Sequence, residues 1–201
     1  MKILAVADEE SKYYYDFYRP GCLDEFDLIL ACGDLKAKYL EFLATMSHCP
    51  VLYVRGNHDD RFAAEPPEGC ICIENQIYKH KGVRIMGLGG SYRYREGENM
   101  YTEKQMKRRI RRMSFALWRN RGFDILLTHA PAYGINDLNS ISHRGFECFL
   151  ELLEKYKPKY FIHGHVHMRY DHKIPKIVTY GDTMIVNACE YCKIELNKEM
   201  R

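Results

Sequence analysis

The sequence has 201 residues, 46% of them hydrophobic, and its 30 Lys and Arg residues against 27 Asp and Glu give a formal net charge of +3. This length and composition fit one globular domain over residues 1–201 with a sizeable core. A charge so near balance does not indicate nucleic acid or an anionic membrane as the default partner. No apolar run is long enough for a membrane helix or a signal-peptide core, so we expect a cytoplasmic protein.

Short apolar runs recur along the chain, each with the length of a strand and rich in Ile, Leu, Val or aromatic residues. They cover residues 2–7, 26–32, 50–55, 82–90, 123–130, 159–165 and 183–188. Hydrophobic residues at helical spacing predict helices over 36–46 and 145–157. Tight turns at Lys81-Gly82 and Gly181-Asp182 predict two antiparallel hairpins. The expected fold is α/β, with two packed mixed β-sheets flanked by helices.

Residues 103–122 form the most basic stretch of the chain. Its hydrophobic residues, Met106, Ile110, Met113 and Leu117, fall on one helical stripe. The arginines are then expected on the flanks and outer face; they are Arg108, Arg109, Arg111, Arg112, Arg119 and Arg121. A solvated helix face is favoured over a surface that binds phosphate or nucleic acid.

The eight cysteines occur without a secretory signal, which favours free or buried thiols over a disulfide framework. Cys189 and Cys192 have the spacing of a redox or zinc half-site. Because no second pair with this spacing exists, we expect both to be buried thiols.

Polar side chains follow most of the predicted strands at their ends, where α/β sheets gather functional groups. They are Asp8, Glu10, Asp34, Asn57, His58, Asp59, Asp60, His129, His163, His165 and His167. Each has a structural explanation of its own, such as a helix cap, a turn or a hydrogen-bonded histidine. Their recurrence at five strand ends instead predicts divalent metal ligands, and there are too many for one ion.

The histidines near residue 165 are expected on an extended strand. Alternate residues of a strand point the same way, so His165 and His167 are predicted to reach one site. His163 shares that parity but lies a further step back. We therefore expect it to support the ligands from behind or to contact the substrate.

This pattern resembles the calcineurin-like metallophosphoesterase family, whose motifs are D-x-H, G-D, G-N-H-D/E, H and G-H-x-H. The corresponding residues are Asp8-Glu9-Glu10, Gly33-Asp34, Gly56-Asn57-His58-Asp59, His129 and Gly164-His165-Val166-His167. By motif order the resemblance runs from residue 3 to about 188. It is greatest to the small bacterial members and their phosphodiesterase relatives.

The resemblance implies two divalent metal ions bridged by Asp34. The implied ligands of one ion are Asp34, Asn57, His129 and His165, and those of the other are Asp8, Asp34, His167 and the residue at position 10. His58 would face the phosphate as general acid or positive hydrogen-bond donor, and Asp59 would orient it. A water or hydroxide that bridges the metals would attack the phosphorus.

Glu10 stands where the family has histidine. A carboxylate there makes the second metal site richer in oxygen, which favours Mn²⁺, with iron, Mg²⁺ and Zn²⁺ as alternatives. The other interpretation is that Glu10 points away from the site and that this metal position is weak or empty.

The sequence thus predicts a metal-dependent phosphoesterase that acts on a small phosphate ester, and family analogy favours a phosphodiesterase. One alternative is a non-catalytic interaction module, as in the retromer subunit of the same fold; the intact His58 motif argues against it. The other is a nucleic-acid phosphodiesterase, which needs the basic stretch 103–122 beside the site.

Overall fold

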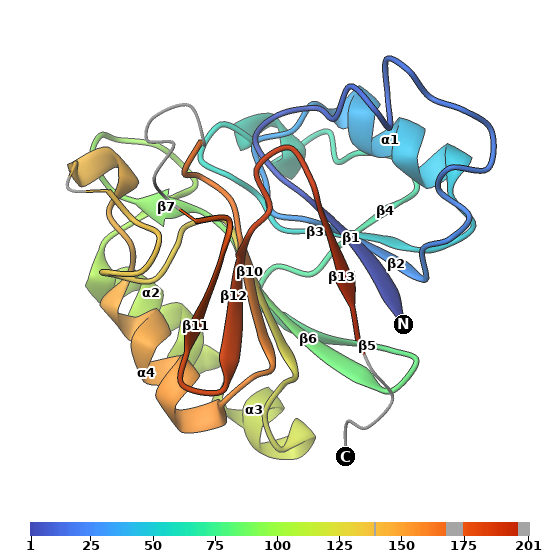
Figure 1. Ribbon diagram of the computed structural model, residues 1–201. Coiled ribbons are helices and arrows are strands. Elements are labelled where there is room, and N and C mark those ends of the chain that lie inside the picture. Colours follow the sequence, from blue (N-terminus) through green and yellow to red (C-terminus); the bar gives the residue numbers. More distant parts are fainter. Residues whose placement is uncertain (139, 168–174, 197–201) are drawn as a thin grey trace.

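Two β-sheets pack face to face, with helices on both outer faces (Figure 1), in the computed structural model of the protein. The structure describes residues 1–138, 140–167 and 175–196. The predicted α/β fold with two packed mixed sheets is confirmed.

The five-stranded sheet contains β1 (Lys2–Val6), β2 (Leu28–Ala31), β3 (Val51–Tyr53), β4 (Cys70–Cys72) and β13 (Cys192–Glu195). The six-stranded sheet contains β5 (Gln76–His80), β6 (Val83–Leu88), β9 (Ile125–Thr128), β10 (Tyr160–His163), β11 (Ile177–Tyr180) and β12 (Thr183–Asn187). A separate short pair is formed by β7 (Ser91–Tyr92) and β8 (Met100–Tyr101). The helices are α1 (Ala37–Met46), α2 (Glu103–Arg112), α3 (Ser114–Asn120) and α4 (Glu147–Tyr156), with single turns at Asp60–Ala63 and Ile141–His143.

The central strands of each sheet are parallel. The first sheet has the order β13-β1-β2-β3-β4 and the second the order β11-β12-β10-β9-β6-β5, with antiparallel strands β13, β5 and β11 at the edges. The carboxyl ends of the parallel strands therefore meet at one edge of the sandwich. The two predicted hairpins are β5–β6 and β11–β12. Lys81 and Gly82 both take positive φ, of 46° and 86°, as the tightest hairpin turn requires.

The strands have continuous apolar sequences because both of their faces are covered. In β1, Ile3 and Ala5 belong to the core between the sheets, whereas Leu4 and Val6 belong to the core under α1. The outer face of the six-stranded sheet packs on α2, α3 and α4 in a third core. The predicted helices over 36–46 and 145–157 are confirmed as α1 and α4.

The basic stretch forms two helices, which are divided at Met113. The predicted hydrophobic stripe faces the sheet, where Met106, Met113 and Leu117 are buried. The expectation that all of its arginines lie outward is wrong for Arg109, which is only 8% exposed. A long charged side chain is stable in a buried position only if a partner of opposite charge neutralises it.

That partner is Glu74, at the start of the loop into β5. The Arg109 guanidinium is ion-paired with the Glu74 carboxylate and donates a further hydrogen bond of 2.7 Å to the Gly89 carbonyl. It also lies 4.3 Å from the centre of the Tyr101 ring. The other oxygen of Glu74 accepts from the Arg55 backbone at 2.9 Å, so the pair connects α2 with the chain just after β3.

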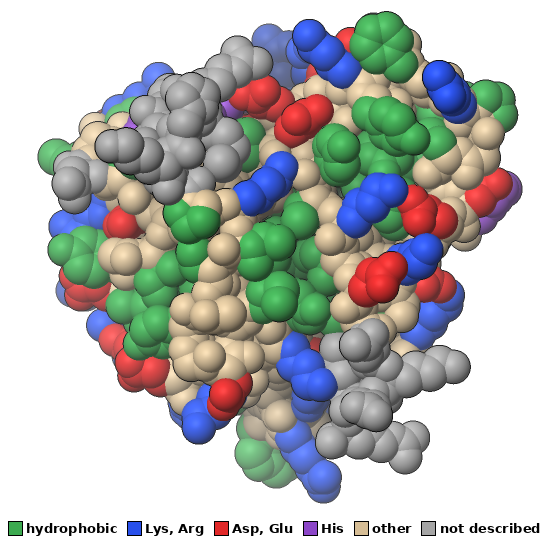
Figure 2. Space-filling view, in the orientation of Figure 1, with side chains coloured by type: hydrophobic (Ala, Val, Ile, Leu, Met, Phe, Trp, Pro, Cys, Tyr) green, Lys and Arg blue, Asp and Glu red, His purple; other side chains and the backbone are tan. Residues whose placement is uncertain are grey.

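Positive and negative side chains are interspersed on the face shown in Figure 2, around a central group of hydrophobic side chains. This distribution fits the small net charge. Among the helices that the structure describes, none combines the length and the apolar character needed to cross a membrane.

We predict that Arg109→Met lowers the free energy of unfolding by about 3–5 kcal/mol, because it leaves the buried Glu74 carboxylate without its partner. Urea denaturation measures the change. Arg108→Met, on the exposed side of the same helix, is the control and should stay within about 0.5 kcal/mol of the parent. Equal stabilities of the two variants would contradict a structural role for the pair.

Candidate metal centre

Polar side chains from both sheets meet at the carboxyl edge of the sandwich. From the five-stranded sheet come Asp8 after β1, Asp34 after β2, and Asn57 and His58 after β3. From the six-stranded sheet come His129 after β9, His165 and His167 after β10, and Cys189 after β12.

Two glycines allow the loops of the first sheet to pack backbone against backbone. A Cβ on Gly33 would lie 2.3 Å from the backbone nitrogen of Gly56. A Cβ on Gly56 would lie 2.0 Å from Oδ1 of Asp34. Neither position has room for a side chain, so the glycines of these two motifs bring Asp34 and Asn57 together.

Left-handed backbone occurs at three of the potential ligands on this edge. Asp8, Asp34 and His165 have φ angles of 61°, 56° and 69°. Such conformations cost on the order of 1–3 kcal/mol each for non-glycine residues and persist where the surrounding structure imposes them. They turn the chain sharply just after the strand and aim three potential ligands at the space between the sheets.

The expected extended strand through His165 and His167 is wrong. Strand β10 ends at His163, and the left-handed backbone of His165 turns the chain away from it. The parity argument therefore does not apply, and the two side chains join two different groups of potential ligands.

The first group is Asp34, His129 and His165, whose potential ligand atoms all lie within 4.8 Å of one another. Nε2 of His129 is 3.3 Å from Oδ2 of Asp34 and 3.0 Å from Oδ1 of Asn57. Burial opposes charge on both Asp34 and His129. Their mutual attraction nevertheless holds the pKa of Asp34 below its usual value and raises that of His129.

Hydrogen bonds to backbone carbonyls orient the two histidine rings of this group. Nδ1 of His129 donates to the Cys32 carbonyl at 2.8 Å, and Nε2 of His165 donates to the Ser142 carbonyl at 2.6 Å. Burial lowers the pKa of His165 to about 3, so its ring is neutral. In His165 the other nitrogen, Nδ1, is not used by that bond and could bind a metal. In His129 the other nitrogen, Nε2, faces Asp34 and Asn57, so a metal would take the place of these contacts.

Asp8 lies between the two sheets and holds the loop after β10. Its carboxylate accepts from the His165 backbone N–H at 3.0 and 2.9 Å. A Cβ on Gly164 would approach Oδ2 of Asp8 to 2.6 Å, so glycine is needed for this contact. Burial raises the pKa of Asp8 to about 6, while the nearby His129 opposes the shift.

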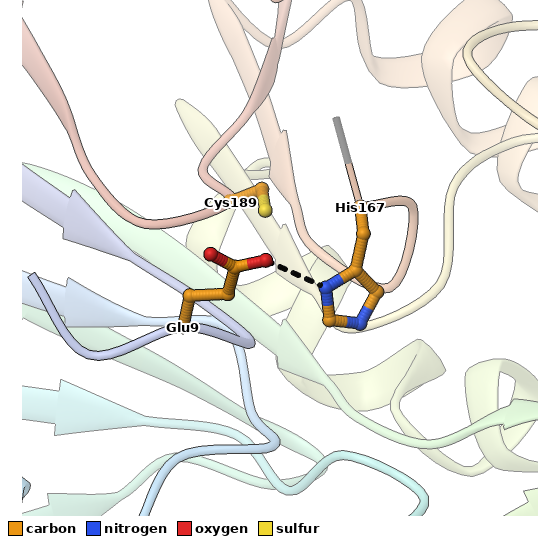
Figure 3. A group of neighbouring side chains, drawn as sticks. All are labelled: Glu9, His167 and Cys189. Atoms are coloured by element: carbon orange, nitrogen blue, oxygen red, sulfur yellow. Dashed lines mark hydrogen bonds and ion pairs between the residues drawn. The ribbon is translucent and has the colours of Figure 1, made fainter. Parts of the chain in front are cut away.

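The second group is Glu9, His167 and Cys189 (Figure 3), again with potential ligand atoms within 4.8 Å of one another. Nδ1 of His167 is 3.2 Å from Oε1 of Glu9. Glu10, the expected ligand, lies in neither group among the described residues. Its carboxylate is ion-paired with Lys36 at 3.2 Å. Glu9 therefore occupies the position beside His167 that the motif alignment gave to Glu10.

His58 is exposed, in a cleft of about 1080 Å³ whose lining also includes Asp34, Lys36, Asp59 and Arg61. Its backbone N–H donates to Oδ1 of Asp34 at 2.8 Å. Asp59 is buried, and its Oδ2 accepts from the backbone N–H groups of Asp34 and Gly56, both at 2.8 Å. The hydrogen bonds of the Asp59 carboxylate thus fix the two glycine loops, and through them the position of His58.

His163 is fully buried at the end of β10. Its Nδ1 donates to the Gly164 carbonyl at 2.9 Å, and burial lowers the pKa of the ring to about 4. Within the described residues, Nε2 has no hydrogen-bond partner. Because the His163 ring has no exposed surface, a role in supporting the ligands fits it better than contact with a substrate.

The residues of the first group fit a divalent ion. They offer one carboxylate and two imidazoles, and the amide oxygen of Asn57 lies beside them, which together is the donor chemistry of Mn²⁺, Fe²⁺ or Zn²⁺. The second group offers a carboxylate, an imidazole and a thiol. Both groups can therefore hold a metal ion.

Sequence reasoning missed Glu9 and Cys189. Cys189 follows a predicted strand at its end, so the rule that selected the other residues could have included it. The CxxC spacing instead paired Cys189 with Cys192, and the lack of a second such pair led to the prediction that both are buried thiols. Cys192 lies on β13 outside both groups. Both cysteines are buried thiols, as expected.

The arginine-rich helices lie away from this cleft. A groove of about 1480 Å³ runs between α2, α3 and α4, lined by Lys104, Arg111, Arg119, Arg121, Lys155 and Trp118 among others. It shares no lining residue with the cleft at His58. Figure 1 shows α2 and α4 on the outer face of the six-stranded sheet, opposite α1.

Comparison with known proteins gives one family match over most of the chain. The model of the calcineurin-like phosphoesterases matches residues 2–169. The solved structure of TT1561 from Thermus thermophilus superposes with a TM-score of 0.64 at 19% identity, over 94% of this chain and 89% of that one. This structural likeness shows a shared fold.

Two relatives come from Caenorhabditis elegans. UPF0046 protein C25E10.12 is 25% identical over 187 residues, which cover 78% of this chain and 62% of the relative. UPF0046 protein K07C11.7 is 23% identical over 218 residues, which cover 94% of this chain and 70% of the relative. The chain thus spans less than two thirds of the length of the first relative.

We predict that Asp34→Asn lowers the metal content of the purified protein more than a change at any other residue of the first group. The substitution keeps the shape but removes the charge that faces His129 and would hold two cations near each other. Elemental analysis measures the bound metal. Asp60→Asn, an exposed carboxylate of the same cleft, should keep the parent's metal content, and full metal occupancy in Asp34→Asn would contradict the prediction.

Proposed function

The chain belongs to the calcineurin-like phosphoesterase family, and on this premise we propose that it hydrolyses a small phosphate ester, with a phosphodiester as the preferred substrate. The observation that carries the proposal is the convergence of Asp34, Asn57, His129 and His165 beside a cleft that exposes His58. Asp34 joins the two features, because it belongs to the buried ligand group and also lines the cleft that exposes His58.

The residues divide the proposed work between binding and proton transfer. Asp34, Asn57, His129 and His165 would hold one divalent ion, and His167 with neighbouring carboxylates would hold a second. Bound ions would supply the positive charge that attracts the phosphate and stabilises the transition state. Mn²⁺ is the ion we propose for the first group, because its ligands mix oxygen and imidazole nitrogen.

His58 would donate a proton to the leaving oxygen, or a charged hydrogen bond to the phosphate. Three features support this role: the side chain is exposed, the cleft of about 1080 Å³ has the volume for a small ester, and the His58 backbone is hydrogen-bonded to Asp34. Asp59 acts through the backbone of the loops. We therefore propose that it positions His58, in place of the direct orientation of the ring that the motif predicts.

A small substrate is favoured over nucleic acid. The arginine-rich groove and the His58 cleft have no lining residue in common, so the basic helices would not guide a strand into the cleft directly. Hydrolysis of an aryl phosphodiester, an aryl monoester, cyclic nucleotides and single-stranded RNA by the manganese-loaded protein tests the preference. We expect the diester to be cleaved fastest. Faster cleavage of RNA with steep salt dependence would contradict the proposal.

We predict that His58→Asn lowers kcat by roughly 10²–10⁴-fold and leaves the metal content unchanged, because the ring transfers a proton and binds no ion. Steady-state kinetics and elemental analysis of the same preparations give both numbers. His48→Asn, an exposed histidine outside the cleft, is the matched control. Retention of full activity by His58→Asn would remove His58 from the mechanism.

A further inference from the structure

We propose that Cys189 is a metal ligand, and that with Glu9 and His167 it forms a thiolate-containing site that selects zinc or ferrous iron over manganese or magnesium. The motifs of the family contain no cysteine at this position, and the sequence predicts only a buried thiol. The proposal rests on the metal-binding part of the proposed function and does not require hydrolysis.

The three side chains converge from three separate loops. Glu9 follows β1, His167 follows β10 and Cys189 follows β12, and Figure 3 shows the carboxylate, the imidazole and the sulfur facing one another. The sulfur, a carboxylate oxygen and a ring nitrogen lie within 4.8 Å of one another. Cys189 is 3% exposed, so its thiol is shielded from solvent on the side of the core.

The backbone fixes Cys189 against both neighbouring loops. The residue before it, Ala188, donates to the His163 carbonyl at 2.7 Å, and the residue after it, Glu190, donates to the Ala7 carbonyl at 2.9 Å. Glu190 takes a left-handed φ of 64°, which makes this second contact part of a sharp turn. The loop after β12 is thereby held between the loop of Glu9 and the loop of His167.

The buried side chain of Asn187 connects the loop of Cys189 with the loop of His167. Its Oδ1 accepts from the Cys189 backbone N–H at 3.0 Å, and its Nδ2 donates to the Val166 carbonyl at 2.7 Å. One buried amide therefore sets the distance between the residue that carries the sulfur and the residue next to His167. A ligand position defined in this way needs no rearrangement to accept an ion.

The donor set decides which ion is preferred. A thiolate is a soft ligand that favours zinc and iron, whereas Mg²⁺ and Mn²⁺ prefer oxygen. When the ion binds, a metal–sulfur bond forms and the thiol proton passes to solvent. The protein would then hold unlike ions, with a harder ion in the group of Asp34 and a softer ion here.

Zinc X-ray absorption of the metal-loaded wild-type protein tests the proposal without any substitution. We expect a sulfur scatterer at ~2.3 Å from zinc. In the cobalt-substituted protein we expect the near-ultraviolet absorption of sulfur-to-cobalt charge transfer. Cys189→Ser should lose both signals, and Cys192→Ser, the other buried cysteine of the CxxC pair, should keep them.

Two results would overturn the proposal: a zinc shell of nitrogen and oxygen alone in the wild type, or a sulfur signal that survives in Cys189→Ser. The test is separate from that of the proposed function. Hydrolysis without a sulfur signal would reject the thiolate site and keep the phosphoesterase. A sulfur signal that is lost only in Cys189→Ser, in a protein that cleaves no ester, would keep the thiolate site and reject the phosphoesterase.

The adjacent glutamates provide a second test. We predict that Glu9→Gln weakens zinc binding at the thiolate site by more than about tenfold, since even losing a group that supports a metal ligand costs ~10–100-fold. Glu10→Gln, which breaks the ion pair with Lys36, should weaken it less. Competition with a chromophoric chelator measures both affinities, and the opposite order would assign the ligand to Glu10.

Discussion

The contact of His129 with the opposite sheet is the interaction on which this edge of the protein depends. The residue follows β9 of the six-stranded sheet, yet its ring reaches the Cys32 carbonyl, Asp34 and Asn57, all supplied by the five-stranded sheet. The ring is completely buried, so each of its nitrogens needs a partner. By satisfying both nitrogens on the other sheet, His129 fixes the relative position of the strand ends. The same geometry brings carboxylate, amide and imidazole groups together.

The loops around this contact pack so closely that some positions have no room for a side chain. Glycines at positions 33, 56 and 164 leave room for neighbouring loops and for the carboxylates of Asp34 and Asp8. The left-handed turns at Asp8, Asp34 and His165 carry a conformational cost that the surrounding hydrogen bonds offset. A cluster of carboxylates and histidines is stable at low dielectric only when its charges are compensated. In the proposed two-metal centre, the ions would supply the remaining compensation and would account for the acidic residues that end the buried strand β1.

Much of this arrangement could be predicted from the sequence, because strands buried on both faces give unbroken apolar runs and the polar residues follow directly after them. The sheets, the hairpins and most of the polar residues at the carboxyl edge were accessible in this way, but Glu9 and Cys189 were not identified. The details of the loops were not. Alternation fails once a residue such as His165 leaves the extended region, and spacing cannot decide between Glu9 and Glu10 when a sharp turn at Asp8 reorients both. The burial of Arg109 was also hidden, since its partner Glu74 lies far away in the sequence.

The central claim is that loops from the two sheets together build a two-metal centre. Crystals of the metal-loaded protein, measured at the absorption edges of zinc and manganese, test it most directly through anomalous scattering. The account predicts two peaks ~3.5–4 Å apart, one in contact with His129 and His165 and the other with His167. A single peak, or peaks remote from Asp34, would contradict it.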